Sequence, residues 1–585
     1  MFWIRLILLV ISFLGYFLFL NRKVDMAIIP IVTFSSIGVI MFIAGLLNIM
    51  VAVTYLLVFV GAILFFWLKP WKFSWNNEAK RSLLIIGCFG VLCMLSAGRL
   101  YGNIPIHYDE FSHWLLVIKD MIYNNHMPNF QSNLITFKGY PTGSAGFIYF
   151  FCKFLEVSRD DFLVFVQSLL IISALLSLLS FIKKVKFFSI LIFLICSIFC
   201  LVANIPITEL LVDTLISVIA ISVVIVGTYY RYNPRKVFFL SLPMQIFLVT
   251  IKNSGLLMMG INGIIMFLIL LYTHHPEGKL SFKSAGKICK CCVGSILIPI
   301  LVYYLWLQHV EYVFNDGALS KHTASIANYT SVLGEKTISQ VNEIIHIFMG
   351  RMFSWNHAWA YLIIFFIIVG LGSWYRKNIL KDGRRFDFVI MGVVIAIYVL
   401  FMAVLGAMYL FSMPYEEAVV LASYERYEYT ILVYLVGMIA VYLLNLFQLT
   451  VKHSKNGTIV PIIIVIMFSG ILVGQVDKIQ TLFVKTNEYL NSDRYLIEEM
   501  KEHYNIPDES SYMIVGDSIA NDSGYHYYLA RYIFRSENVG VCEPRMLDTG
   551  VLKQKYLIIL DENKKVDKFL LENGYTLGEK VYVMN

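Results

Sequence analysis

The chain has 585 residues, of which 58% are hydrophobic and only 15% are charged, and its formal net charge is +8. This composition excludes an ordinary soluble globular protein, in which about a quarter of the residues are charged. The positive charge is spread over many short loops, so it indicates membrane topology and not a nucleic-acid-binding surface.

The hydrophobic residues fall into blocks, many of them near the length of about 20 residues that a helix needs to cross a bilayer. The first block runs directly into Asn21-Arg22-Lys23 with no small-residue cleavage site, which predicts a retained span and not a signal peptide. The pattern predicts about fourteen transmembrane helices. The predicted spans are Trp3–Leu20, Met26–Leu47, Val51–Leu68, Ser82–Ala97, Phe162–Phe181, Phe188–Val202, Leu211–Tyr229, Val237–Thr250, Gly255–Leu271, Val293–Trp306, Ala358–Trp374, Phe388–Phe411, Thr430–Phe447 and Val460–Val473.

Basic residues mark alternate loops between these spans, from Arg22-Lys23 in the first such loop to Lys452 and Lys455 in the last. All of these basic loops fall on one side of the membrane, which the positive-inside rule assigns to the cytoplasm. Both termini and the large polar segments then lie outside. The segments predicted outside are loops 98–161, 307–357 and 412–429, and the tail after Gln475.

The first outer loop opens with the string Ile-His-Tyr-Asp-Glu-Phe-Ser-His-Trp at residues 106–114, and Asp109 and Glu110 stand where the fourth span emerges. Adjacent carboxylates at such a place can act as a general base or hold a divalent cation. Alternatively, they are acids that favour the first turn of a helix. The segment Leu115–Met121 is expected to form an amphipathic helix at the outer interface, with Trp114 as an interfacial anchor.

A second pair of acids, Glu209 and Asp213, lies at the outer end of the seventh span. Their i, i+4 spacing predicts that both lie on one helix face. Ionisable groups at the edge of a span are costly and usually face a polar cavity, although a water-exposed loop end would also accommodate them.

Two cations are predicted on the same side: Lys252 in a tight hairpin between apolar runs, and Arg426 just before the thirteenth span. Either could bind a phosphate at the membrane surface. Alternatively, Lys252 extends to the lipid headgroups and Arg426 pairs with Glu425 or Glu428.

The tail alternates short apolar runs at Tyr512–Val515, Tyr556–Leu560 and Val581–Met584 with helical stretches at Tyr525–Phe534 and Lys565–Glu572. This alternation predicts a small α/β domain over residues 475–585. The carboxylates of the tail are scattered among Lys and Arg, as on a solvated surface, so catalytic acids are not expected there, with Asp517 after the first strand as the one candidate.

The order of these outer elements resembles the GT-C superfamily of integral-membrane glycosyltransferases. The resemblance rests on the acidic pair, the interfacial helix after it, and the string Lys-Gly-Tyr-Pro-Thr-Gly at residues 138–143, which leads into the aromatic segment Phe147–Leu155. It covers about residues 82–474, with residues 1–81 as an extension of three transmembrane helices. The superfamily includes protein mannosyltransferases and lipid A aminoarabinose transferases.

The resemblance implies an all-α polytopic membrane protein with a GT-C-like core and a small extracytoplasmic α/β domain. The implied substrates are a polyprenyl-phosphate-linked sugar donor and a cell-surface glycan or glycolipid acceptor. Asp109 would be the catalytic base of an inverting transfer, with Glu110 beside it, and Asp213 matches the second acid of the superfamily better than Glu209. Mg²⁺ or Mn²⁺ could be held by Asp109, Asp213 and Glu209. The implied donor-phosphate ligands are Lys252, Arg426, Tyr427 and His113.

Two other classes of protein stay open. A surface-polysaccharide polymerase or ligase would rely on basic residues in its outer loops, such as His309, His322, His346 and Arg351. A transporter would need charged or helix-breaking residues near the middle of the bilayer and an internal repeat. The chain shows no clear repeat, and its acids cluster at one face.

Overall fold

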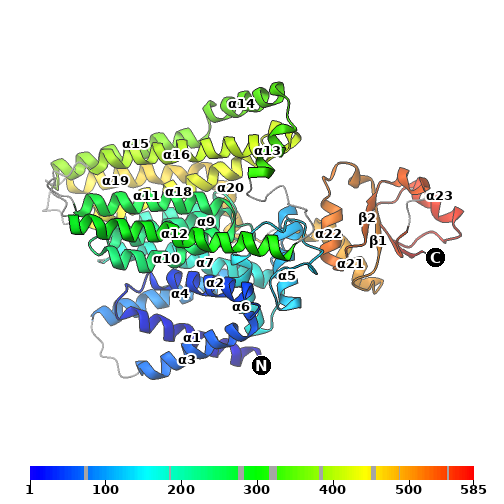
Figure 1. The fold of residues 1–585 in the computed structure, drawn as a ribbon, viewed down its shortest axis with the longest axis horizontal. Coiled ribbons are helices and arrows are strands. Elements are labelled where there is room, and N and C mark those ends of the chain that lie inside the picture. Colours follow the sequence, from blue (N-terminus) through cyan, green and yellow to red (C-terminus); the bar gives the residue numbers. More distant parts are fainter. Residues whose placement is uncertain are drawn as a thin grey trace.

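The computed structural model describes residues 1–70, 77–183, 186–274, 282–314, 326–380, 386–448, 456–485, 488–549 and 553–584. Over this part of the chain the fold is mostly helical, and twelve helices are long and apolar enough to cross a membrane. They form one bundle, with a separate domain at one of its ends (Figure 1). These helices are α1 (Phe2–Asn21), α2 (Ile29–Leu46), α3 (Met50–Leu68), α4 (Asn77–Leu100), α7 (Asp160–Leu176) with a 3₁₀ turn to Phe181, α10 (Pro234–Ile251), α11 (Ser254–His274), α12 (Phe282–Val313), α15 (His357–Asn378), α16 (Phe386–Phe411), α18 (Tyr424–Gln448), and α19 (Asn456–Ser469), which continues through a 3₁₀ turn into α20 (Val476–Phe483).

Two further helices, α8 (Phe187–Val202) and α9 (Asp213–Tyr229), lie in the bundle and are somewhat shorter than the others. Each predicted span therefore coincides with a helix, while the exact number that crosses the membrane stays a prediction. Helix α9 is buried from Asp213 to Gly227 and packs against α18, α10 and α11. An apolar helix that is buried on all sides forms the centre of a membrane bundle, so the start of α9 is held firmly in place.

The N-terminal helices differ in how they join the bundle. Helices α1 and α3 pack mainly against each other, and a side chain on Gly15 would lie 1.9 Å from the Gly61 carbonyl oxygen. Such close approach of small residues is a common basis of helix pairing in membranes. Helix α2 instead packs into the core against α10, where Gly38 makes room for the ring of Phe247. Of the predicted three-helix extension, residues 1–81, helix α2 is therefore the one that packs into the core of the bundle.

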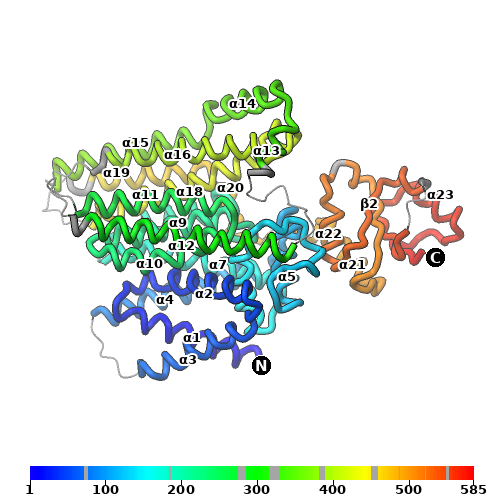
Figure 2. Tube along the Cα trace, in the orientation of Figure 1, coloured from blue at the N-terminus to red at the C-terminus, as the bar shows by residue number. Residues whose placement is uncertain are grey.

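The described parts of the loops with basic residues meet at one end of the bundle. Arg81 pairs with Asp25 at 2.7 Å, Lys186 donates to the Phe447 carbonyl at 2.6 Å, and Lys236 donates to the Lys23 carbonyl. The opposite end carries the C-terminal domain, and Figure 2 shows the N-terminus at that end too. The predicted alternation of loops is thus reproduced, while the assignment of the basic end to the cytoplasm stays a prediction.

The first outer loop folds into a π-helical turn (Glu110–Trp114), α5 (Leu115–Asn124) and α6 (Gly143–Leu155). The predicted helix after Trp114 is present. Residues 115–118 are all buried, and α5 packs against α6 and the π-helical turn, so its first turn is covered by protein, while its location at the outer interface stays a prediction. The Trp114 ring lies on His113 and Tyr140. The other short helices of the outer segments are α13 (Ile326–Gly334), α14 (Ile338–Phe353) and α17 (Tyr415–Val419).

The C-terminal domain is a small α/β unit, as predicted. Its described residues form a four-stranded sheet of order β2-β1-β3-β4, parallel except for the last pair. The predicted strands and helices are found within a residue or two, whereas β2 and α21 were not predicted. The elements are α21 (Asp493–His503), β1 (Tyr512–Val515), α22 (Tyr525–Phe534), β2 (Val539–Cys542), β3 (Tyr556–Ile559), α23 (Lys564–Glu572) and β4 (Val581–Val583).

Helix α22 holds this domain against the first outer loop. Arg531 donates to the carbonyls of Asn133 and Leu134 at 2.9 and 3.1 Å. The ring of Tyr525 meets the edge of Phe111, and Tyr528 meets Tyr108, the residue before Asp109. The domain therefore lies directly over the acidic motif of the first loop.

Candidate active site

Glu110 is wholly buried, and its carboxylate links the first outer loop to the segment that precedes α9. One oxygen accepts the backbone N–H of His107 at 3.0 Å, and the other accepts that of Leu210 at 2.7 Å. Burial raises the pKa of Glu110 to about 8. Because both oxygens are engaged inside the protein, Glu110 is suited to positioning the loops and is not exposed to a substrate.

Asp109 immediately precedes the π-helical turn, and its backbone N–H donates to Nδ1 of His107 at 3.1 Å. Such wide turns are rare and are frequently found at functional sites. The turn lets Glu110 point into the protein while Asp109 stays partly open, with 31% of its side chain exposed.

Asp213 is the first residue of α9, and its side chain is almost completely buried. The prediction that Glu209 and Asp213 share a helix face is wrong, because Glu209 precedes the helix. Hydrogen bonds from side chains hold that segment in a non-helical conformation. The Gln167 amide donates to the carbonyls of Glu209 and Leu211. The Thr214 hydroxyl accepts the backbone N–H of Ile205 and donates to the carbonyl of the same residue. Burial raises the pKa of Glu209 to about 7.

Lys252 lies between α10 and α11, in the tight hairpin that the sequence predicts. The hairpin is close because Gly255 has no side chain; a Cβ there would lie 1.9 Å from the Leu248 carbonyl oxygen. The Lys252 ammonium does not extend to headgroups. It points inward and donates to Oδ1 of Asp213 at 2.9 Å, with the Tyr427 ring 5.4 Å away.

Arg426, in the first turn of α18, connects the two aspartates. Its Nη1 donates to Oδ2 of Asp109 at 2.5 Å, and its Nε lies 3.7 Å from Oδ2 of Asp213. Its Nη2 is 3.4 Å from the Tyr427 hydroxyl. Two acids and two bases from four distant segments thus form one compact cluster in which the formal charges balance.

The alternative partners of Arg426 are engaged elsewhere. Glu425 pairs with Arg351 at 2.7 Å. Glu428 accepts hydrogen bonds from the hydroxyls of Tyr398 and Tyr424, at 2.9 and 3.3 Å. The pairing of Arg426 with a sequence neighbour, one of the two predicted alternatives, is therefore not found.

The three predicted metal ligands do not form one ligand group. Among the described residues no group of three or more acidic, His or Cys side chains converges on one point. Oxygens of Asp109 and Asp213 already face Arg426 and Lys252, so a divalent cation would have to displace both bases. The residues present do not fit a metal site, and the reaction proposed below uses only groups of the chain.

Two residues of the predicted phosphate site differ in their surroundings. Tyr427 lies in the cluster, with its ring beside both cations. His113 is buried, with ring centroids 4.7 Å from Trp114 and 5.0 Å from Tyr140, so it supports the loop from within. The placement of His113 does not favour contact with a donor phosphate.

Sequence reasoning did not single out His107 or Tyr140, although both stand in the strings that carry the resemblance. Burial lowers the pKa of His107, and the adjacent Asp109 carboxylate acts in the opposite direction. Burial also raises the pKa of the Tyr140 hydroxyl well above its ordinary value, and Tyr427, Asp109 and Asp213 add to this effect. Both residues therefore sit in the electrostatic field of the cluster.

No family model, no curated protein and no solved structure matches the chain. The function must therefore be inferred from the chemistry of the site.

Proposed function

We propose that the chain is a GT-C-type glycosyltransferase of the cytoplasmic membrane, which transfers a sugar from a polyprenyl-phosphate donor to a glycan or glycolipid on the outer face. The supporting observation is the ion-paired cluster of Asp109, Asp213, Lys252 and Arg426. It lies at the end of the bundle that bears the C-terminal domain, where a lipid-linked donor and an aqueous acceptor can meet.

In the proposed reaction, Asp109 is the base because it is the exposed acid of the cluster. Its carboxylate takes the proton of an acceptor hydroxyl, and the hydroxyl oxygen attacks the anomeric carbon. The bond from that carbon to the phosphate oxygen breaks, and polyprenyl phosphate leaves with the electron pair. Attack opposite the phosphate inverts the anomeric centre. Arg426 and Lys252 stabilise the leaving phosphate by charge-assisted hydrogen bonds.

The resting ion pairs give the donor a second role in this proposal. Arg426 holds Asp109 at 2.5 Å, so in the resting state the guanidinium occupies the carboxylate oxygen that would accept the proton. A donor phosphate that binds Arg426 competes for the guanidinium and releases the carboxylate. Proton abstraction is then favoured only after the donor has bound.

The test is transfer of a labelled sugar from a polyprenyl-phosphate donor by the purified full-length chain, with donor binding and released polyprenyl phosphate measured in parallel. Asp109→Asn keeps the shape of the side chain and removes its charge. Turnover should fall by about 10²–10⁴-fold, the usual cost of losing a general base, while donor binding persists. Glu425→Gln, next to Arg426 but on the exposed side, is the matched control.

Near-normal turnover of Asp109→Asn would remove the catalytic assignment. The other classes give different products: a transporter moves its substrate without releasing polyprenyl phosphate, and a polymerase or ligase transfers a preassembled saccharide and not a single sugar. Of the residues that would favour a polymerase or ligase, Arg351 is paired with Glu425, His309 stacks on Trp306, and His322 lies outside the described residues.

A further inference from the structure

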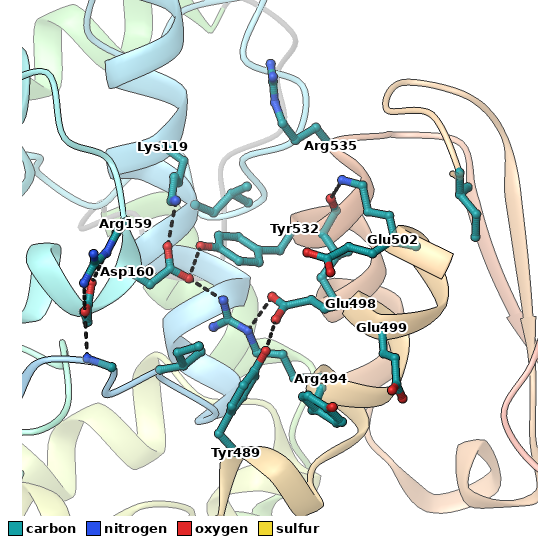
Figure 3. A pocket seen from close by; sticks show the side chains of 18 of the residues that line it. Lys119, Arg159, Asp160, Tyr489, Arg494, Glu498, Glu499, Glu502, Tyr532 and Arg535 are labelled. Carbon is teal, nitrogen blue, oxygen red and sulfur yellow. Dashed lines mark hydrogen bonds and ion pairs between the residues drawn. The ribbon is translucent and has the colours of Figure 1, made fainter. Parts of the chain in front are cut away.

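A cleft of about 1030 Å³ separates the C-terminal domain from the first outer loop. One wall is formed by residues 101–104, by α5 and by the start of α7, and the other by α21 and α22 (Figure 3). This volume is at the upper end of the range of about 300–1,000 Å³ that is typical of ligand sites. Its lining does not include Asp109, so it is a second feature beside the cluster.

Buried ion pairs fix the shape of this cleft. Arg494, of which only 3% is exposed, donates to Asp160 from across the cleft, to the Pro105 carbonyl at 2.5 Å and to Glu498 at 2.9 Å. Lys119 also pairs with Asp160, at 2.7 Å, as Figure 3 shows. In this network each charged side chain has a partner of opposite charge. The network therefore holds the two walls at a fixed separation, as a preorganised binding site requires.

The walls offer aromatic faces and hydrogen-bonding groups side by side. Tyr489 and Tyr495 form an edge-to-face pair with ring centroids 5.4 Å apart. The carboxylates of Glu499 and Glu502 line the same wall, are exposed, and have no ion pair or hydrogen bond to any described residue. A saccharide presents C–H faces that pack on tyrosine rings and hydroxyls that donate to carboxylates.

The charge of the lining argues against an anionic ligand. Five cations, Lys119, Arg159, Arg494, Lys501 and Arg535, line the cleft together with six carboxylates, those of Asp120, Asp160, Asp161, Glu498, Glu499 and Glu502. A site for phosphate would carry an excess of positive charge. A neutral, hydroxyl-rich ligand suits this balance.

The cleft and the cluster share helix α22. Tyr532 and Ile533 line the cleft, whereas Tyr528, one turn earlier, contacts Tyr108 beside Asp109. One helical turn is about 5.4 Å. The wall of the cleft and the contact beside Asp109 therefore lie on neighbouring turns of one helix.

We propose that this cleft binds the acceptor glycan, a neutral saccharide chain, and directs its end toward Asp109. This inference rests on the proposed function. It assigns the C-terminal domain the role of selecting the acceptor, whereas the donor is bound by the membrane bundle.

The test measures binding of the saccharide fraction released by mild acid from the envelope of the cell that carries the gene. The fraction is fluorescently labelled and titrated with the full-length chain in lipid nanodiscs. The double variant Glu499→Gln/Glu502→Gln should raise the Kd at least about tenfold, because hydrogen bonds to charged groups are lost. Tyr495→Ala should have a similar effect, and Tyr495→Phe, which keeps the ring, should not. Glu562→Gln, at an exposed site outside the cleft, is the matched control.

Three results would overturn the proposal: no binding by the unaltered chain, an unchanged Kd in the double variant, or an equal loss in Glu562→Gln. Sugar transfer is assayed with the same variants, so the two proposals can fail separately. A chain that binds the saccharide in the cleft but transfers no sugar would refute the glycosyltransferase. A chain that transfers sugar with an unchanged acceptor KM in the cleft variants would refute the cleft assignment.

Discussion

Asp213 and Lys252 form the most deeply buried charge pair of the site, and each depends on the other. Replacing Lys252 by Met removes the closer of the two cations that face the buried Asp213 carboxylate and leaves Arg426 at 3.7 Å. Breaking a buried ion pair from one side costs about 3–5 kcal/mol. We expect Lys252→Met to lower the thermal stability strongly, and Lys252→Met/Asp213→Asn to recover much of the loss. A double variant less stable than the single one would contradict the pairing.

The same double variant separates the structural role of Lys252 from phosphate binding. If Lys252 serves only Asp213, a stable double variant should bind the donor normally. If Lys252 also holds the phosphate, as proposed, the donor KM should rise while the fold persists.

The buried Glu110 predicts in which direction the stability of the fold changes with pH. Its pKa in the folded chain is about 8, above its ordinary value of 4.5, because the side chain is buried. Between these values the folded chain holds a proton that the unfolded chain releases, so the contribution of Glu110 to stability falls as the pH rises. Thermal unfolding at pH 5, 6, 7 and 8 should show this decline, and Glu110→Gln should flatten it.

Glu110→Gln should also lower stability at every pH. An amide has one acceptor oxygen, so one of the two backbone N–H groups loses its partner, at a cost of about 1–3 kcal/mol. Glu562→Gln, at an exposed position, should change neither the stability nor its slope with pH. A Glu110→Gln variant that keeps the original slope would show that another group titrates.

The sequence alone identified the site residues that stand at the ends of apolar runs. Asp109, Asp213, Lys252 and Arg426 could each be singled out because an ionisable group at a membrane edge is costly and therefore informative. Their mutual pairing could not be predicted. Arg426 has acids on both sides in the sequence, at Glu425 and Glu428, and only the packing of α18 against α9 decides that it faces Asp213.

At the scale of elements, local pattern predicted the helices and most strands, and long-range contacts decided the exceptions. Strand β2 was missed because Val539–Cys542 is short and contains Gly540. It becomes a strand through parallel pairing with β1, where Gly540 makes room for Met513. The segment before α9 was predicted as helix because its own residues permit one, but the side chains of Gln167, Thr214 and Glu110 bond its backbone instead.

Helices α21 and α22 are linked by His526, which gives the C-terminal domain a pH-sensitive contact. Its two ring nitrogens lie 2.7 Å from Asp522 and 3.1 Å from Asp493. Burial disfavours the charged ring, but hydrogen bonds to both carboxylates outweigh it and raise the pKa of His526 above its ordinary value of 6.5. The added stability is full below about pH 6.5 and is lost as the pH rises through the higher folded value.

We therefore expect hydrogen exchange of the α22 amides, corrected for intrinsic rates, to show protection that weakens above neutral pH. His526→Gln keeps the size of the side chain and part of its hydrogen bonding but cannot titrate, so it should remove the pH dependence. His503→Gln, at an exposed position in the same domain, should leave it unchanged. Equal pH dependence in His526→Gln and the unaltered chain would assign the effect to another residue.

At the scale of the whole molecule, the bundle has two chemically different ends. One gathers the basic loops, tied by contacts such as Arg81–Asp25, and the other gathers the acidic cluster and the C-terminal domain. The alternation of basic loops along the sequence could reveal this arrangement because lysine and arginine are retained on the cytoplasmic side. The direction of insertion is a separate property of the molecule.

Cysteine labelling tests that direction. In a background without the nine native cysteines, single cysteines replace Glu425 and Gln131 at the cluster end, and Tyr232 and Lys377 at the basic end. All four positions are exposed, so access to them depends on the membrane and not on packing. An impermeant maleimide added to intact cells should label the first pair, and should label the second pair only after permeabilisation, because the positive-inside rule places the basic end in the cytoplasm. The reverse pattern would put Asp109 in the cytoplasm, away from any donor presented at the outer face, and the proposed glycosyltransferase would then be untenable.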